Sequence, residues 1–407
     1  MTNVRRATAF LCLMALFFSG TPLSSAQPLQ PGSGEPAWLS LERGKRAFGN
    51  KDFGEAIMQF DSAIAVRRGV FTTAAARLDQ ALEAKAAVTA GDSINNVLAA
   101  FAAEDFLQRD YARLTAGRSS TSKSFLESLR LERISDSHRA FIEVLLLVLE
   151  YRPMEAMNDS ISTLRNRVRL LITYPEAEYW KGRVFFVEGE LSLAELQYKR
   201  AYSMIPALEI PDELYTILYS MAELYDAHSD FVAWENVMRG IVDSDDKDID
   251  AFLREAMMAT LQNDGFNRFM TLYRLKPSYS LDANAALASF YLERGRAPAL
   301  MHAAVAVNMT LTRAIAMLEL KDRNYSWNSL EEFLLMASRR KDVAAHLQEA
   351  GLPRLLLVLA DSLYISGGRS AAAMLWNAVN SLGTAPYSAV ALARLSNPAS
   401  AVRRAAP

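Results

Sequence analysis

The chain has 407 residues, a formal net charge of −2 and a hydrophobic content of 51%. Its basic and acidic side chains are mixed along the chain, without the basic surplus or stripe that neutralises phosphates, which argues against nucleic acid as a partner. The single cysteine, Cys12, rules out a disulfide within the chain. A chain of this length is too long for one compact core, so the length predicts several domains or an extended repeat.

The N-terminus has three zones: a basic start with Arg5 and Arg6, an apolar run over 7–18, and small residues up to Ala26. This order predicts a secretory signal peptide over 1–26, with cleavage after Ala26 and a periplasmic mature protein. The apolar run is shorter than the ~20 residues that a membrane-spanning helix needs. An uncleaved anchor remains the alternative.

Signal removal would change the chemistry of the mature protein. Cys12 would leave with the signal, so no thiol would remain for metal binding or nucleophilic catalysis. Arg5 and Arg6 would leave as well, and the net charge would move from −2 to −4. No later stretch looks long and uncharged enough to cross a bilayer, so the sequence predicts no transmembrane segment after cleavage.

Residues 27–36 are rich in Pro, Gly and Ser and predict a disordered tether. From residue 37 onward the chain is rich in Ala, Leu, Met, Glu and Arg, and apolar residues return at steps of three and four, as over 155–173 and 352–364. No segment shows a convincing strand pattern. The sequence therefore predicts an all-α fold.

One spacing recurs along the chain: a small residue, an apolar one three later, a small or apolar one nine after that, then a large residue four on and a small or apolar one three on. The clearest copy is Gly182, Phe185, Ala194, Tyr198 and Ala201. The other copies are Gly44, Ala47, Ala56, Phe60, Ala63; Ala222, Tyr225, Trp234, Met238, Ile241; Ala288, Tyr291, Leu300, Ala304, Val307; and Ala360, Leu363, Ala372, Trp376, Val379. A repeat of this kind determines the architecture, because each unit packs against its neighbours.

The spacing predicts two antiparallel helices joined by a tight turn. Small residues facing each other let the two helix axes approach, and the large side chain fills the space toward the next pair. The predicted turns are Lys51-Asp52, Gly189-Glu190, Ser229-Asp230, Gly295-Arg296 and Gly367-Gly368. Glycine tolerates a positive φ at the end of the first helix, and aspartate caps the second helix.

The stretch from Trp180-Lys181-Gly182 through Tyr198, Ala201 and Pro206 resembles a tetratricopeptide repeat (TPR), and residues 37–63 are similar to a second one. The resemblance implies a helical-hairpin solenoid, a TPR-like superhelix in two segments. It also implies that the first helix of each pair lines a concave face where partners bind. The positions that would face this groove are Trp38, Lys45, Tyr179, Arg183, Phe186, Tyr219 and Glu223, together with Leu41 and Phe48. In the alternative interpretation Leu41, Phe48 and Phe186 pack between helices.

The predicted organisation follows from these patterns. TPR-like helices occupy 37–114, and a Ser/Thr-rich flexible loop at 115–124 is followed by a helical segment without clear repeats at 125–175. A TPR-like solenoid extends over 176–395. A disordered tail closes the chain at 396–407.

No motif predicts catalysis, a metal or a cofactor. The four histidines lie far apart without a second ligand at metal-binding spacing. The acidic run 243–250 lacks the glycine and closing glutamate of a calcium loop, so we interpret it as an inter-helix loop in which Asp248 or Asp250 caps a helix that starts near Ala251. Glycine-rich phosphate loops and a nucleophile elbow are missing from the sequence.

The sequence therefore predicts a non-catalytic scaffold of the cell envelope that binds a protein or peptide through aromatic and charged groove residues, the types that dominate binding hot spots. The alternative is an accessory subunit of an envelope transporter or of a peptidoglycan enzyme, which would bind a small hydrophobic ligand or a glycan. The partner and the oligomeric state are not specified by the sequence.

Overall fold

The computed structural model describes residues 36–87, 166, 169–170, 172–245 and 249–405. Every regular element in this part of the chain is a helix, which confirms the all-α prediction. The predicted signal peptide and tether, the loop at 115–124 and most of the segment 125–175 lie outside the described residues.

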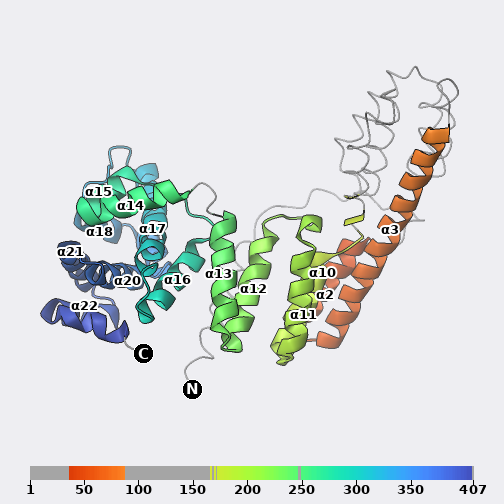
Figure 1. Ribbon diagram of the computed structural model, residues 1–407, viewed down its shortest axis with the longest axis horizontal. Coiled ribbons are helices and arrows are strands. Elements are labelled where there is room, and N and C mark those ends of the chain that lie inside the picture. Colours follow the sequence, from red (N-terminus) through yellow and green to blue (C-terminus); the bar gives the residue numbers. More distant parts are fainter. Residues whose placement is uncertain (1–35, 88–165, 167–168, 171, 246–248, 406–407) are drawn as a thin grey trace, which may run out of the picture.

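Five helical hairpins form at the five predicted copies of the spacing (Figure 1). They are α2 (Ala37–Gly49) with α3 (Phe53–Ala87), α10 (Pro175–Glu188) with α11 (Leu191–Ser203), α12 (Glu213–Ala227) with α13 (Phe231–Asp245), α16 (Leu281–Glu293) with α17 (Ala299–Lys321), and α20 (Leu352–Ile365) with α21 (Arg369–Ser381). The two helices of each pair pack against each other.

All five turns share one backbone conformation. The first turn residue has a positive φ in each case: Lys51, Gly189, Ser229, Gly295 and Gly367. The next amide donates to the carbonyl five residues earlier, as in Asp52 N to Ala47 O at 2.9 Å, which is the helix-ending bond of a Schellman motif. The predicted aspartate caps are also present, because Asp52 accepts from Glu55 N and Asp230 from Ala233 N.

The smallest side chains lie where the helices of a hairpin come closest. A Cβ placed on Gly182 would lie 2.5 Å from Cδ1 of Tyr198, whose side chain is fully buried. Gly44 meets the ring of Phe60 in the same way. Glycine at these two positions therefore permits a packing that even alanine would disturb.

The hairpins pack in chain order, with the second helix of each one against the first helix of the next (Figure 1). Helix α3 packs on α10, α11 on α12, α13 on α16, and α17 on α20. The first of these contacts joins hairpins that are separated in sequence by residues 88–174.

Helices that were not predicted as hairpin members lie between and after the later hairpins. They are η1 (Ile205–Ala207), α14 (Ala251–Asn263), α15 (Phe266–Leu272), α18 (Leu330–Ser338), α19 (Lys341–Glu349), α22 (Tyr387–Ser396) and η2 (Pro398–Ala405). Asp250 caps α14 by accepting from Leu253 N at 2.7 Å, which confirms the predicted cap. The acidic run is not wholly a loop, because residues 243–245 form the end of α13.

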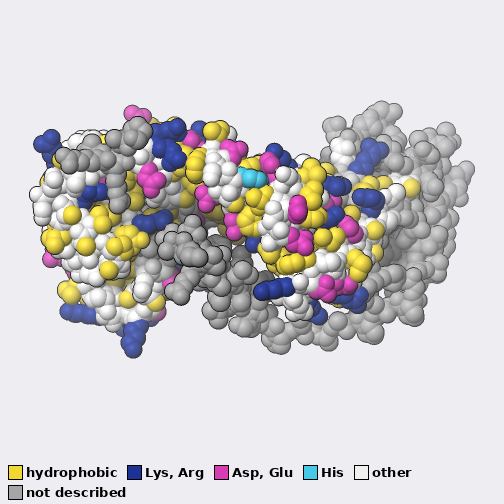
Figure 2. Space-filling model, turned by 90° about the horizontal axis from the view of Figure 1, so that it is seen from below, with side chains coloured by type: hydrophobic (Ala, Val, Ile, Leu, Met, Phe, Trp, Pro, Cys, Tyr) yellow, Lys and Arg dark blue, Asp and Glu magenta, His cyan; other side chains and the backbone are white. Residues whose placement is uncertain are grey.

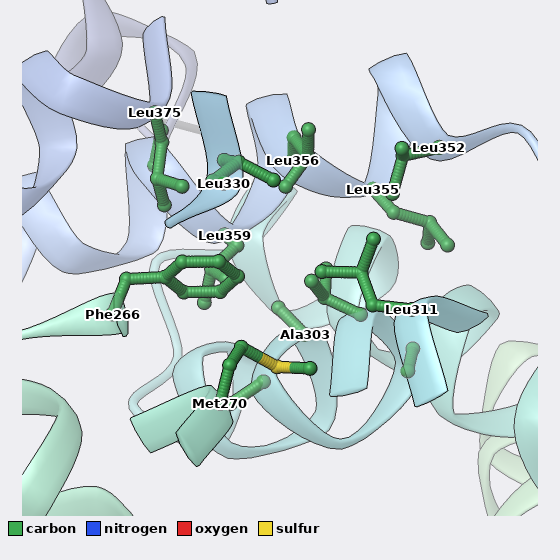
Figure 3. Close-up of a cluster of buried hydrophobic side chains, with 14 of the residues drawn as sticks. Phe266, Met270, Ala303, Leu311, Leu330, Leu352, Leu355, Leu356, Leu359 and Leu375 are labelled. Atoms are coloured by element: carbon green, nitrogen blue, oxygen red, sulfur yellow. The ribbon is translucent and has the colours of Figure 1, made fainter. Parts of the chain in front are cut away.

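The added helices join the last two hairpins into a C-terminal block with one continuous hydrophobic core. Figure 3 shows Phe266, Met270, Leu330, Leu356 and Leu359 converging from different helices. Helix α17 lies within this core and is long and apolar enough to span a membrane by composition, but two-thirds of its most apolar window is buried by protein. The absence of a transmembrane segment after the signal stays a prediction.

The predicted disordered tail at 396–407 is wrong for its described part. Residues 398–405 form η2, which packs against α20 and α22, and Ala401 is buried. A buried charge holds this end: Arg394 pairs with Asp361 at 3.3 Å and donates to Ser400 Oγ at 2.7 Å. Asp361 also accepts from Trp376 Nε1 at 2.9 Å. The composition of the tail is polar and small, and gave no sign of this anchor.

Candidate partner-binding surface

The predicted groove residues lie on three first helices that neighbour each other in space. Helix α10 contacts α2 on one side and α12 on the other, although α2 and α10 are far apart in sequence. We call the adjoining faces of these helices the first-helix surface. Its members are Trp38, Glu42 and Lys45 from α2, Arg183 and Phe186 from α10, and Glu213 and Glu223 from α12.

Arg183 links two of the helices across this surface. Its guanidinium donates to Glu223 Oε2 at 2.7 Å, over a separation of 40 residues in sequence, and lies 5.6 Å from the ring centre of Phe186. The Arg183 side chain keeps 20% of its exposure and Glu223 keeps 50%. The structure thus brings these three predicted residues together at one place.

Lys45 occupies the other end of the surface. Its ammonium pairs with Glu42 Oε1 at 2.8 Å and lies 5.8 Å from the ring centre of Trp180. Glu213, at the first turn of α12, is close enough for Lys45 to lower its pKa. Burial is the larger effect and raises the pKa of Glu213, and the nearby carboxylates of Glu209 and Glu42 raise it further.

Trp38 is the most accessible aromatic side chain of the predicted set, with 54% of its area exposed. At the other end of α2, Phe48 lies edge-on to Trp180 at 5.4 Å and packs beside Phe53. Leu41 is buried. The packing interpretation is therefore confirmed for Leu41, and Phe48 is also engaged by neighbouring rings.

One of the predicted groove residues is buried, and a second is held through its hydroxyl. Tyr179 is a core residue, 8% exposed, with its ring stacked on Tyr198 and its hydroxyl 3.0 Å from Ser220 Oγ. Tyr219 fixes the loop before α16, since its hydroxyl donates to the Tyr279 carbonyl at 2.6 Å and accepts from Ala283 N at 3.0 Å. The hydroxyl of each tyrosine forms hydrogen bonds with another helix or loop, which helical spacing alone does not predict.

Sequence reasoning missed Trp180, Glu213 and Ser220. Glu213, Ser220 and Glu223 are seven and three residues apart, so they share one face of α12. Extending the helical spacing backward from Glu223 would have predicted Glu213 and Ser220. Trp180 gave no signal, because it lies beside the predicted face and is placed by its contact with the first hairpin.

Aromatic, basic and acidic side chains lie together on the first-helix surface. Hydrophobic, basic and acidic side chains are likewise interspersed over the face of the molecule seen in Figure 2. Within the described ranges no three His, Cys, Asp or Glu side chains come together in a way that could hold a metal ion. An indole, half-buried cations and exposed carboxylates on adjoining helices are suited to contact with a polypeptide.

A protein of Treponema pallidum (strain Nichols), described as uncharacterized, is 24% identical to this chain over 231 residues. The match covers 55% of this chain and 62% of the relative, so the chain spans less than two thirds of the length of the relative it matches. A comparison with models of known protein families gives no match.

Proposed function

We propose that this chain is a non-catalytic scaffold of the cell envelope whose helical hairpins form a TPR-like solenoid, and that it binds a protein or peptide partner on the first-helix surface. The signal-like N-terminus supports export, and the regular hairpin order supports the solenoid. The contact between Arg183 and Glu223 carries the proposal, because it joins predicted groove residues from different hairpins into one surface.

The partner contacts follow from the exposures on this surface. Trp38 supplies the exposed aromatic anchor, since a partner that covers its indole removes a large apolar area from water. Arg183 and Glu223 already satisfy each other, so they orient a partner more than they add affinity. Glu213 has its charge partly removed from water and fits a basic group of the partner.

Export is tested by sequencing the N-terminus of the mature protein recovered from the periplasm. The proposal expects the mature chain to begin at Gln27. A cytoplasmic protein that retains residues 1–26 would contradict it.

Binding is tested by placing a photoreactive amino acid at Trp38 or at Glu223 and cross-linking in the intact envelope. The matched control places it at Leu196 of α11 or Met58 of α3, which are similarly exposed but lie on second helices. We expect a discrete adduct from the first pair only, and the loss of the adduct formed at Glu223 when Trp38→Ala is combined with Lys45→Ala. Equal adducts from both pairs would show that the first-helix surface is not the binding site.

A further inference from the structure

A carboxyl group is buried at the joint between the first and second hairpins. Glu176, in the first turn of α10, is 4% exposed. Its Oε1 accepts from the backbone N of Glu209 at 2.6 Å, and its Oε2 is buried without a hydrogen-bond partner. A carboxylate ion in this position would lack a compensating bond on one oxygen.

The nearest cation is already engaged. Arg67 of α3, 3% exposed, pairs with the Glu209 carboxylate, donates to the Ala207 carbonyl at 3.2 Å and lies 4.4 Å from the ring centre of Tyr174. Through these contacts α3 holds residues 207–209, which lead from η1 toward α12.

The charges around Glu176 come from every side of the joint. Arg67 faces it from α3, Glu209 from the segment after η1, and Tyr174 from the residue that precedes α10. Farther out, Glu213 of α12 faces Glu209, with Lys45 and Glu42 of α2 beside it. Burial raises the pKa of Glu176 to about 7, and the pull of Arg67 does not cancel that effect.

We propose that Glu176 is a proton-controlled latch: its protonated form keeps α3, α10 and segment 207–213 closed together, and ionisation favours an open conformation in which water reaches the carboxylate. In the closed joint Glu176 keeps its proton to a higher pH. In the open joint it releases the proton near the ordinary glutamate pKa. The closed state therefore loses stability as the pH rises from the ordinary value toward 7, and the loss levels off above 7.

Opening at this place would act on the helix that follows. Segment 207–213 runs into α12, whose contact with α10 includes Arg183 and Glu223. The latch concerns the fold itself, and its test needs no partner, so its failure would leave the binding proposal standing.

The test is amide hydrogen exchange of the full chain between pH 5 and pH 8, expressed as protection relative to the intrinsic rate at each pH. The reporter is the Glu209 amide, which is bonded to Glu176. Protection should fall by up to about tenfold per pH unit between pH 5 and pH 7 and then stay level. The amide of Met238 in α13, away from the joint, should show no such fall.

Glu176→Gln keeps an oxygen that accepts from Glu209 and cannot ionise, so its Glu209 protection should be independent of pH. Glu178→Gln is the matched control in the same turn, because Glu178 is equally buried but has Arg200 at 3.2 Å and Lys181 at 3.9 Å. That variant should keep the fall. Circular dichroism verifies that both variants fold. If one variant does not fold, the pH dependence of Glu209 protection in the wild type alone tests the latch. A flat wild-type profile, or the same fall in Glu176→Gln, would overturn the latch.

Discussion

The hairpins from α2 to α13 and the C-terminal block from α14 to η2 are built from similar helices but bury them differently. In the block, α17 is surrounded, and its residues from Ala303 to Leu311 are all buried. In the N-terminal row, α12 buries one side against its neighbours and keeps Glu223 accessible. The added helices thus bury surface in the block that stays exposed in the N-terminal row. For this reason we propose that the partner binds to the row.

The cores differ in chemistry as well. The row is held by rings and polar links between hairpins, such as Tyr179 on Tyr198 and Lys181 with Asp61 at 2.7 Å. The block is held by one large cluster, rich in leucine and alanine, in which rings such as Phe266 and Trp327 also pack against each other. Polar side chains such as Asp361 and His302 are buried inside the block. The four predictions that follow probe this difference, from the largest expected effect to the smallest.

Loss of the buried ion pair should be the most damaging change to the block. Asp361→Ala leaves the Arg394 charge buried without its partner and removes the acceptor of Trp376 Nε1, so we expect a loss of about 3–5 kcal/mol in the free energy of unfolding. Chemical denaturation measures it. Asp342→Ala breaks the exposed pair with Lys321 and should leave the midpoint almost unchanged. Similar losses in the two variants would contradict the anchoring of η2.

Acid should weaken the block through His302. Burial lowers the pKa of His302 to about 4, whereas an unfolded histidine has its ordinary value near 6.5. As the pH falls from 6.5 to 4, the unfolded chain takes up a proton that the folded chain refuses, so stability drops by about 3 kcal/mol. Below pH 4 this loss levels off, and above pH 6.5 it vanishes. The sign is opposite to that of Glu176, whose protonation favours the folded row.

His302→Gln should remove this pH dependence. Nδ1 of His302 lies 2.8 Å from Asn284 Oδ1, and because Asn284 Nδ2 donates to the Ser280 carbonyl, the ring nitrogen is the donor that a glutamine amide can replace. The measurement is the urea midpoint between pH 4 and pH 7, followed by exchange at amides of α16 and α17. A variant that keeps the wild-type slope would assign the effect to another group.

Close approach of helices should matter more in the row than helix propensity does. Gly182→Ala places a methyl against the buried ring of Tyr198, so we expect a loss of about 2–3 kcal/mol. Gly240→Ala is the control: it lies within α13 with open space around it and should gain about 0.5–1 kcal/mol. Thermal unfolding compares them. Stabilisation by both alanines would show that the hairpin does not depend on this contact.

The smallest effect concerns a turn. Ser229 adopts a left-handed conformation with φ of 58°, where the equivalent turn residues Gly189, Gly295 and Gly367 carry no side-chain strain. Ser229→Gly should therefore raise the free energy of unfolding by about 0.5–1 kcal/mol. Ser229→Ala, measured beside it by denaturant midpoint, should give no such gain. Equal midpoints for the two variants would contradict the strain at this turn.

The sequence was sufficient to predict features that depend on residues close together in the chain. Gly189 and Gly367 marked their turns, and the small residues at 182 and 201 marked paired helices, because backbone conformation and close approach restrict the residue type. The tail is different, because the ion pair between Arg394 and Asp361 holds this end of the chain. This contact crosses the fold, and no local sequence pattern predicts it.

The candidate surface was predictable to the same limit. Spacing placed Arg183 and Glu223 on helix faces that meet, since a face follows from the helical period. It could not tell that Tyr179 and Tyr219 point their hydroxyls into neighbouring elements, because this depends on how the hairpins meet.

The absent side chain of Gly182 lets α10 lie close against Tyr198 of α11, and the later hairpins pack on that pair one after another. A small change of angle between α10 and α11 would therefore displace the far end of the molecule much more than the pair itself. One hydrogen atom in place of a methyl group thus affects the placement of every later hairpin.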